Sequence, residues 1–261
     1  MLERTAEIGP GAAAGRHSLP HTSELSSQPL STLQLRTYRQ RFLRYAPYKR
    51  AFDVANASVQ LLVFSPLFLL AAVAIKLSDR GPVFFRQTRM TGGGSKGART
   101  FEILKFRTMV VNAEQLGAKI TQKRDPRITR IGRLLRATKI DEMPQLLNIL
   151  RGEMSFVGPR PQTMGYVGHF RKHYEAIHSI LPAGLTDLAS LKYRDEARLL
   201  EDAPDKERFY IEVIMPDKIA YHYAYLSRAS FSLDLSILAR TLLYVIFERP
   251  WTKAMRWVND V

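Results

Sequence analysis

Two adjacent carboxylic acids, Asp141 and Glu142, stand inside an arginine-rich block that covers residues 123–162. The pattern predicts that the pair begins a helix, because Pro144 would fall in its first turn and Gly152 just past its end. The positive end of the helix dipole would then keep both carboxylates ionised near neutral pH. Ionised carboxylates suit two kinds of chemistry, the binding of Mg²⁺ and nucleophilic attack on phosphorus. Helix capping is the alternative that involves no chemistry.

Basic residues on both sides of this pair favour phosphate chemistry over capping. A run that contains Arg127 and Arg136 precedes the pair. Arg160 follows it between Pro159 and Pro161, and two prolines hold a backbone stiffly. Guanidinium groups bind phosphate through paired N–H donors, so a fixed arginine suits a positioned phosphate contact.

The composition agrees with an anionic partner. The chain of 261 residues carries a formal net charge of +15, which indicates nucleic acid, anionic lipid headgroups or phosphorylated substrates. A solvated basic surface is the plainer alternative. The chain has no cysteine, which excludes disulfides, thiolate nucleophiles and cysteine-ligated metal sites.

The first fifty residues divide into two segments. Residues 1–32 are rich in Ala, Gly, Ser, Pro and His and show no hydrophobic period, so we expect disorder and no signal peptide. Residues 33–50 combine Arg and Lys with Tyr and Phe and contain no acid. Such a stretch beside an apolar segment is typical of an interfacial membrane anchor, and an RNA-binding arm is the alternative.

Residues 51–77 form the one strongly apolar run. As a helix it would reach about 40 Å, enough to cross a hydrocarbon core of about 30 Å. However, Ser65-Pro66 lies at its centre, where proline forces a kink, and both flanks are strongly positive. A helix broken at Ser65-Pro66 that enters and leaves by the cytoplasmic face satisfies both observations. A kinked single-pass span is the alternative.

The remainder predicts a small α/β domain that is mostly helical. Residues 82–90 and 100–109 are expected to be two strands joined by a glycine-rich turn, which lacks the Lys-Ser/Thr pair of a P-loop. Helices are expected at residues 128–138, 142–150, 166–179, 199–206 and 221–227. Residues 231–247 are apolar but carry Asp234 and Arg240, which fits an interfacial or core helix.

Several of these stretches, taken together and in order, resemble the bacterial sugar transferases, also called monotopic phosphoglycosyl transferases or polyprenyl-phosphate sugar-1-phosphate transferases. The resemblance covers about residues 48–243. Directly after LPAGLT, at residues 181–186, the chain reads DLASLKYRDEARLL, whereas many members of the family have a tryptophan-containing sequence in this region. The matching pieces are KRAFD at 49–53, Ser65-Pro66, GPVFFRQTR at 81–89, FEILKFRTM at 101–109, the block at 125–161, LPAGLT at 181–186 and SLDLSILARTL at 232–242.

The resemblance implies a fold and a reaction. The fold is a re-entrant membrane helix with a break, a small cytosolic catalytic domain and interfacial amphipathic helices. The reaction moves a sugar-1-phosphate from a nucleoside-diphosphate sugar, usually a UDP-sugar, to polyprenyl (undecaprenyl) phosphate and releases UMP. Asp141 would attack the sugar-bearing phosphorus to form an aspartyl phosphosugar, and Glu142 would hold the required Mg²⁺. Basic positions that match the family's motifs are assigned to phosphate binding: Lys105, Arg107, Arg127, Arg136 and Arg160.

The same resemblance places the protein at the bacterial inner membrane, with its catalytic domain in the cytoplasm, at the first step of a surface glycan such as an exopolysaccharide, capsule, O-antigen or glycoprotein glycan. Residues 78–250 would be the catalytic domain and residues 251–261 a tail. Inner-membrane lipids are expected partners, nucleic acid is not, and a homodimer stays open. A membrane-attached nucleic-acid-binding protein and an inactive scaffold are the alternatives, but neither accounts for Asp141-Glu142.

Overall fold

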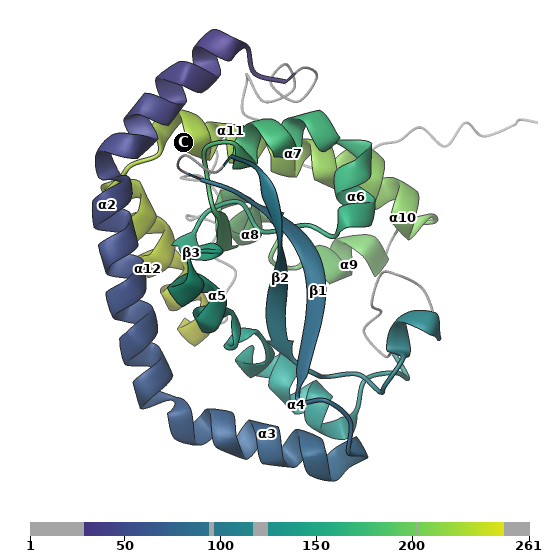
Figure 1. Cartoon of the computed structure of the whole chain (residues 1–261). Helices are drawn as coiled ribbons and strands as arrows, with labels where there is room; N and C mark the ends of the chain where they lie inside the picture. The colour runs from purple at the N-terminus through teal and green to yellow at the C-terminus, as the bar shows by residue number, and fades with distance from the viewer. Residues whose placement is uncertain (1–28, 94–96, 117–124, 202, 248–261) are drawn as a thin grey trace, which may run out of the picture.

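The computed structural model describes residues 29–93, 97–116, 125–201 and 203–247. The predicted tail and all but residues 29–32 of the predicted N-terminal extension lie outside these residues. The described chain is mostly helical with two small sheets, which confirms the α/β, mostly helical class. In Figure 1 a long helix runs down one side of the molecule, a second helix turns beneath it, and the remaining elements fill the angle between the two.

The two outer helices are α2 (Thr32–Val63) and α3 (Ser65–Asp79), which meet at an angle of 62°. The bend lies where the sequence predicts a break. Pro66 stands in the first turn of α3, and the Ser65 hydroxyl donates to the Leu62 carbonyl oxygen at 2.8 Å. Within the described residues no single helix is long and apolar enough to cross a membrane, whereas the bent pair taken together is. Entry into a membrane therefore stays a prediction.

The basic part of α2 is partly used inside the protein. Arg39 donates to the Ser179 carbonyl oxygen after α7 (Arg171–His178) at 2.8 Å, and Arg41 donates to the Ser227 carbonyl oxygen in α11 (Met215–Arg228). Arg50 donates to two carbonyl oxygens, of Ile149 at 2.5 Å and Leu150 at 2.7 Å, in the last turn of α5 (Gln145–Arg151). A cation is favourable at the C-terminus of a helix, so these arginines fasten α2 to three other helices.

A buried polar cluster, which we call the α2 joint, fixes the middle of α2 to α12 (Phe231–Phe247). Lys49 Nζ lies 2.6 Å from Asp234 Oδ2, and both side chains are about 5% exposed or less. The Tyr225 hydroxyl donates to the other oxygen of Asp234 at 2.6 Å. Asp53 accepts the backbone N–H of Phe156 at 3.1 Å. Burying a polar or charged group costs free energy unless it is paired, and each of these groups has a hydrogen-bond or ion-pair partner.

The predicted strands form an antiparallel hairpin of β1 (Phe84–Thr91) and β2 (Arg99–Phe106), with Phe84 opposite Phe106 and Thr91 opposite Arg99. A second, parallel pair was not predicted: β3 (Met154–Val157) and β4 (Ala183–Thr186). All four residues of β3 are buried, so it lacks the apolar–polar alternation by which a strand is recognised. Gly184 approaches the Gly158 carbonyl so closely that an added Cβ would lie 2.1 Å from its oxygen.

Most helices differ from the prediction at their ends, but the helix predicted at residues 199–206 is interrupted, because residues 203–205 between α9 and α10 are not helical. Residues 166–179 form two helices, α6 (Met164–His169) and α7, because the backbone leaves helical geometry at Phe170. Residues 142–150 form α5, which begins only at Gln145. The other elements are η2 (Ala113–Gln115), α4 (Arg130–Ala137), η3 (Ile140–Glu142), α8 (Leu188–Lys192), α9 (Glu196–Glu201), α10 (Lys206–Phe209) and η4 (Tyr210–Ile214).

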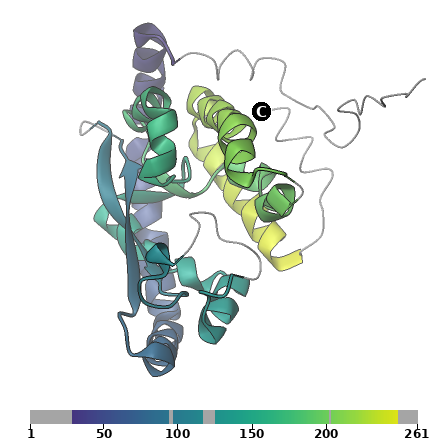
Figure 2. The ribbon, with the colours of Figure 1, turned by 90° about the vertical axis from the view of Figure 1, so that its right-hand side faces the viewer.

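The main core lies between the β1–β2 hairpin and the last two helices. Figure 2 shows α11 and α12 on the opposite side of the molecule from the hairpin. Between them pack the β3–β4 pair and α5, together with tyrosines of α7 and α11 that are almost fully buried, among them Tyr174 and Tyr225. A smaller cluster joins α3 to α4 through Ile75, Phe106 and Leu135. The site residues thus rest on a rigid scaffold of buried strands and helices.

Candidate active site

The carboxylate pair lies in η3, a single 3₁₀ turn between α4 and α5. The chain leaves α4 through Lys139, whose positive φ of 59° turns the backbone into η3. Met143 and Pro144 keep helical dihedrals, so the backbone runs on into α5 at Gln145. The prediction that Asp141-Glu142 begins the helix itself is therefore wrong by one turn: the pair precedes it.

Glu142 is held by two basic side chains from distant parts of the sequence. Lys105 Nζ of β2 lies 2.8 Å from Glu142 Oε1, and the guanidinium of Arg160 donates to the same oxygen. Burial alone would raise the pKa of Glu142, but the charges and hydrogen bonds of Arg160 and Lys105 outweigh it and lower that pKa. Glu142 is consequently ionised over the whole physiological range.

Asp141 differs from its neighbour. It is 9% exposed, and its Oδ1 has no hydrogen-bond partner among the described residues. Burial raises the pKa of Asp141, the charge of Glu142 raises it further, and Lys105 and Arg136 act in the opposite direction. The raised pKa of Asp141 is opposite to the direction expected from a helix dipole, whereas the lowered pKa of Glu142 agrees with it. Burial dominates the shift at Asp141, while at Glu142 the cations Arg160 and Lys105 outweigh burial.

The pair fits a magnesium ion that is shared with a phosphorylated substrate. No group of three or more His, Asp or Glu side chains within the described residues could hold a metal ion by itself. Mg²⁺ is usually bound by one or two carboxylates together with substrate phosphates and water. The carboxylate of Glu142, with Asp141 beside it, offers such a ligand, and magnesium binding itself stays a prediction.

The five predicted basic residues fall into two groups. Lys105 and Arg160 contact Glu142, and Arg136 is near enough for its charge to lower the pKa of Asp141. Arg136 itself donates to the Thr108 hydroxyl at 2.8 Å. Arg107 instead pairs with Asp79 at the end of α3, and Arg127 pairs with Asp125, with Nη2 and Oδ2 2.6 Å apart. Phosphate binding by any of the five stays a prediction.

Asp187, which directly follows β4, was not predicted as a site residue. One of its carboxylate oxygens accepts the backbone N–H of Arg160 at 3.0 Å, and the other accepts that of Ser190 at 2.6 Å. The available signal was an acid three residues before a serine at the start of a helix, which is an N-cap pattern. That pattern predicts a capped helix but not a contact with Arg160.

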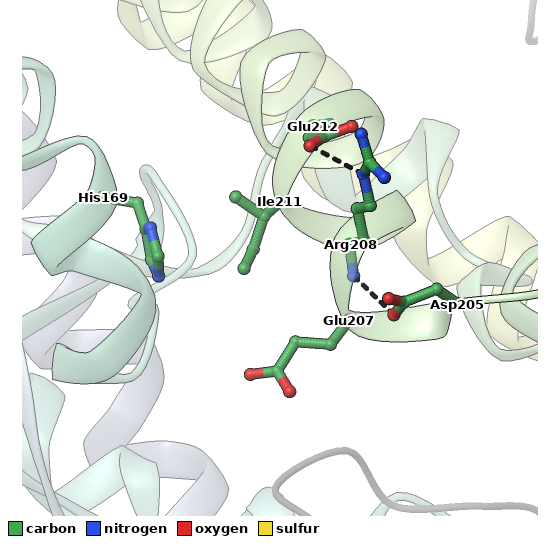
Figure 3. Close-up of a pocket in the computed structure, with 6 residues that line it drawn as sticks. All are labelled: His169, Asp205, Glu207, Arg208, Ile211 and Glu212. Atoms are coloured by element: carbon green, nitrogen blue, oxygen red, sulfur yellow. Dashed lines mark hydrogen bonds and ion pairs between the residues drawn. The ribbon is translucent and has the colours of Figure 1, made fainter.

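A surface hollow elsewhere contains no predicted site residue. Figure 3 shows it between His169, at the end of α6, and residues of α10 and η4. Several of its polar groups pair with one another: Arg208 Nε lies 2.9 Å from Glu212, and the Arg208 backbone N–H donates to Asp205 at 3.0 Å. These side chains satisfy one another at the surface, so the carboxylate pair is the stronger candidate for chemistry.

Comparison with known proteins shows which family the chain belongs to. The family model described as bacterial sugar transferase matches residues 44–248. The UDP-glucose:undecaprenyl-phosphate glucose-1-phosphate transferase of Caulobacter vibrioides (strain ATCC 19089 / CIP 103742 / CB 15) is 40% identical over 198 residues, which are 74% of this chain and 68% of that protein. The exopolysaccharide production protein PSS of Rhizobium leguminosarum bv. phaseoli is 37% identical over 202 residues, 75% of this chain and 93% of that protein.

A third relative is much longer. The UDP-N-acetylgalactosamine-undecaprenyl-phosphate N-acetylgalactosaminephosphotransferase of Aeromonas hydrophila is 37% identical over 205 residues. These residues are 77% of this chain but only 44% of the Aeromonas protein. The chain thus spans less than half the length of this relative and matches nearly all of the Rhizobium protein.

Proposed function

The chain belongs to the bacterial sugar transferase family, and we propose that it transfers a sugar-1-phosphate from a UDP-sugar to polyprenyl phosphate. Two of its relatives are named as transferases of a sugar phosphate to undecaprenyl phosphate. The observation that carries the proposal is the asymmetry of the carboxylate pair. Glu142 is neutralised by Lys105 and Arg160, whereas Asp141 keeps a buried, unpaired oxygen.

Asp141 is the nucleophile in this reaction. Its unpaired oxygen attacks the phosphorus that bears the sugar, the bond from that phosphorus to the UMP oxygen breaks, and UMP leaves with the electron pair. A phosphate oxygen of the polyprenyl phosphate then attacks the aspartyl phosphosugar and displaces Asp141, which regenerates the carboxylate. Burial raises the pKa of Asp141, and a more basic carboxylate is a better nucleophile once it is ionised.

The surrounding charges serve the same two steps. Both substrates are phosphorylated and repel each other, so cations must neutralise them before an in-line displacement. Lys105 and Arg160 have that role beside Glu142, with Arg136 close to Asp141. Glu142, with Asp141 next to it, would hold Mg²⁺, which supplies charge neutralisation on the transferred phosphoryl group.

The bent pair α2–α3 is the membrane element of the proposal. It enters the inner membrane from the cytoplasmic face and returns to the same face, so the carboxylates meet both the soluble donor and the phosphate of the embedded acceptor. The exposed large apolar residues of this pair support it: Val59, Leu62, Val63, Leu69, Leu70, Val73 and Leu77. The product is the lipid-linked sugar with which a surface glycan begins.

Topology can be tested by labelling, since the chain contains no cysteine. Leu33→Cys and Leu116→Cys place single thiols before and after the apolar segment, at positions that are 76% and 66% exposed. In spheroplasts, a membrane-impermeant maleimide should label neither thiol until the membrane is broken. Labelling of one thiol alone in intact spheroplasts would establish the single-pass span instead.

The chemistry is tested without the lipid acceptor. The purified protein is incubated with Mg²⁺ and a panel of UDP-sugars labelled at the β-phosphorus, and UMP and protein-bound label are measured together. We expect UMP release matched by label on the protein, which hydroxylamine removes and which Asp141→Asn does not acquire. UMP release that strictly requires polyprenyl phosphate, with no label on the protein, would contradict the covalent route.

A further inference from the structure

A chain of polar contacts leads from the carboxylate pair to His222, a buried histidine that the reaction does not use directly. Arg160 is the first link, because its guanidinium donates to Glu142 with one nitrogen and to the Leu185 carbonyl oxygen with the other, at 3.0 Å. Its backbone N–H donates to Asp187 Oδ2 at 3.0 Å. Arg160 is therefore fixed at three points, and two of them lie in residues 185–187 at the end of β4.

Asp187 is the second link and joins three elements. Besides the backbone of Arg160, it accepts the N–H of Ser190 and so caps α8. The Nε2 of His222, in α11, lies 2.8 Å from Asp187 Oδ2. Both side chains are about 2% exposed or less. A buried carboxylate with this many donors is strongly held in place.

The charge state of Asp187 agrees with this role. Burial would raise its pKa, but the adjacent His222 and the donors of Ser190 outweigh burial and lower the pKa to about 2. Asp187 is consequently ionised whenever the protein works. An ionised acceptor binds a backbone N–H more tightly than a neutral one does.

The strand pair that carries these residues leaves little room for adjustment. The Gly158 N–H donates to the Thr186 carbonyl oxygen at 3.1 Å, and the Gly184 N–H donates to the Pro159 carbonyl oxygen at 3.0 Å. A Cβ on Gly184 would lie 2.1 Å from the Gly158 carbonyl oxygen. The backbone that presents Arg160 is thus tied directly to the segment that ends in Asp187.

We propose that Asp187 and His222 are positioning residues, which hold Arg160 and through it Glu142 in the geometry that sugar-phosphate transfer requires. Neither residue touches the carboxylate pair. The inference rests on the proposed function for its kinetic consequence, while the placement of Arg160 can be measured without any substrate. Outer partners of this kind tune the groups that bind metal and substrate, because they fix the orientation of those groups.

The matched pair of variants is Asp187→Asn and Asp217→Asn. Asp217 also ties α8 to α11, through Lys192 at 2.7 Å and the Tyr193 hydroxyl at 2.7 Å, but has no contact with Arg160. With purified protein, polyprenyl phosphate and the UDP-sugar that it uses, we expect Asp187→Asn to lower kcat about ten- to a hundredfold and to raise the Mg²⁺ concentration for half-maximal rate. Asp217→Asn should leave both near their wild-type values, although it too removes side-chain contacts between α8 and α11.

A second pair of variants, both at His222, tests the histidine and still tests the proposal if Asp187→Asn does not fold. His222→Gln keeps an N–H donor near the place of Nε2, whereas His222→Leu removes it. We expect the glutamine variant to retain most of the wild-type kcat and the leucine variant to reproduce the kinetic defect of Asp187→Asn. Equal rates for the two His222 variants, or equal effects of the two aspartate variants, would overturn the proposal.

Hydrogen exchange separates this inference from the proposed function. The backbone amides of residues 157–163 should exchange faster in Asp187→Asn than in the wild-type protein. In Asp217→Asn their exchange rates should equal those of the wild-type protein. If the wild-type protein releases no UMP from any UDP-sugar, the proposed function is wrong, and the exchange experiment still decides the placement of Arg160. Unchanged exchange in Asp187→Asn would show that Asp187 does not hold this segment.

Discussion

The α2 joint and the carboxylate pair are both buried clusters of acids and bases, but Asp234 of the joint is paired through both of its oxygens and Asp141 is not. In the joint, Lys49 and Tyr225 each bind one oxygen of Asp234. At the carboxylate pair, Glu142 is held by Lys105 and Arg160 while Asp141 Oδ1 has no partner among the described residues. Burying an unpaired polar atom costs about 1–3 kcal/mol. Asp141 Oδ1 is one of several such atoms among the described residues, and it is distinguished by its place beside the charges of Glu142, Lys105 and Arg136.

The largest effect that this comparison predicts is the loss of activity in Asp141→Asn. Removal of a nucleophile should lower the transfer rate by about a thousandfold or more, because no other described group replaces the attacking oxygen. The free energy of unfolding should stay the same or rise, since a buried charge without a partner is removed. Transfer is measured as UMP release, and stability by thermal unfolding of the same preparation. A loss of stability equal to that of a joint variant would erase the distinction between the two clusters.

The joint should show the opposite result. Lys49→Met leaves the carboxylate of Asp234 buried without its cation, which should lower the free energy of unfolding by about 3–5 kcal/mol. Activity per folded molecule should change little, because the joint holds no reacting group. Denaturant unfolding and an activity assay on the folded fraction measure the two quantities. Arg171→Ala is the control, since its pair with Glu175 is exposed and such pairs are worth about 0.5 kcal/mol or less.

Glu142→Gln tests whether Glu142 binds magnesium while Asp141 acts as the nucleophile. The amide is almost the same size but carries no charge, so the Mg²⁺ concentration that gives half the maximal rate should rise about tenfold or more. Glu153→Gln is the matched control, because Glu153 lies just past the other end of α5 and accepts from Asn148 at 2.7 Å. A magnesium titration that is unchanged in Glu142→Gln would remove Glu142 from the ligand set.

The smallest predicted effect is a dependence of stability on pH. Because the pKa of Asp141 is raised in the folded protein, the folded state binds more protons than the unfolded state above the ordinary aspartate pKa of 3.8. The free energy of unfolding of the wild-type protein should therefore fall, relative to that of Asp141→Asn, as the pH rises from 3.8 through the raised pKa of Asp141. Above that pKa the difference between the two proteins should no longer change with pH. Denaturant unfolding of both proteins across this range, in buffer without magnesium, measures the difference. A difference that shrinks with rising pH would reverse the assigned direction of the shift.

Some of this site can be predicted from sequence because its signals are local. Asp141-Glu142 is recognisable as adjacent acids among arginines, and the Ser65-Pro66 break is readable because proline acts on its own turn. Lys105 and Arg160 were expected near phosphate, and the structure adds that they meet on one oxygen of Glu142. Their meeting depends on packing across the molecule, which the sequence pattern does not contain.

The missed features are those made by tertiary contacts. The β3 strand is buried on both faces and shows no alternation, so it could not be told from a loop or a short helix. Asp187 reads locally as a helix cap, and its contact with the backbone of Arg160, 27 residues away, requires the strand pair to be known. Likewise the arginines of α2 are typical of a lipid anchor, yet Arg50 is used on the carbonyl oxygens of α5.

The fastening of α2 has a consequence for the order of events during synthesis. Arg41 and its acceptor in α11 are separated by 186 residues, and Lys49 and Asp234 by 185. A ribosome adds about 5–20 residues per second, so α2 waits roughly ten seconds or more for these partners to be made. During that interval the basic groups of α2 lack the carbonyl and carboxylate partners that they have in the folded protein. Arg41 and Lys49 are therefore available to other anionic groups first, and they fasten α2 to the rest of the domain only afterwards.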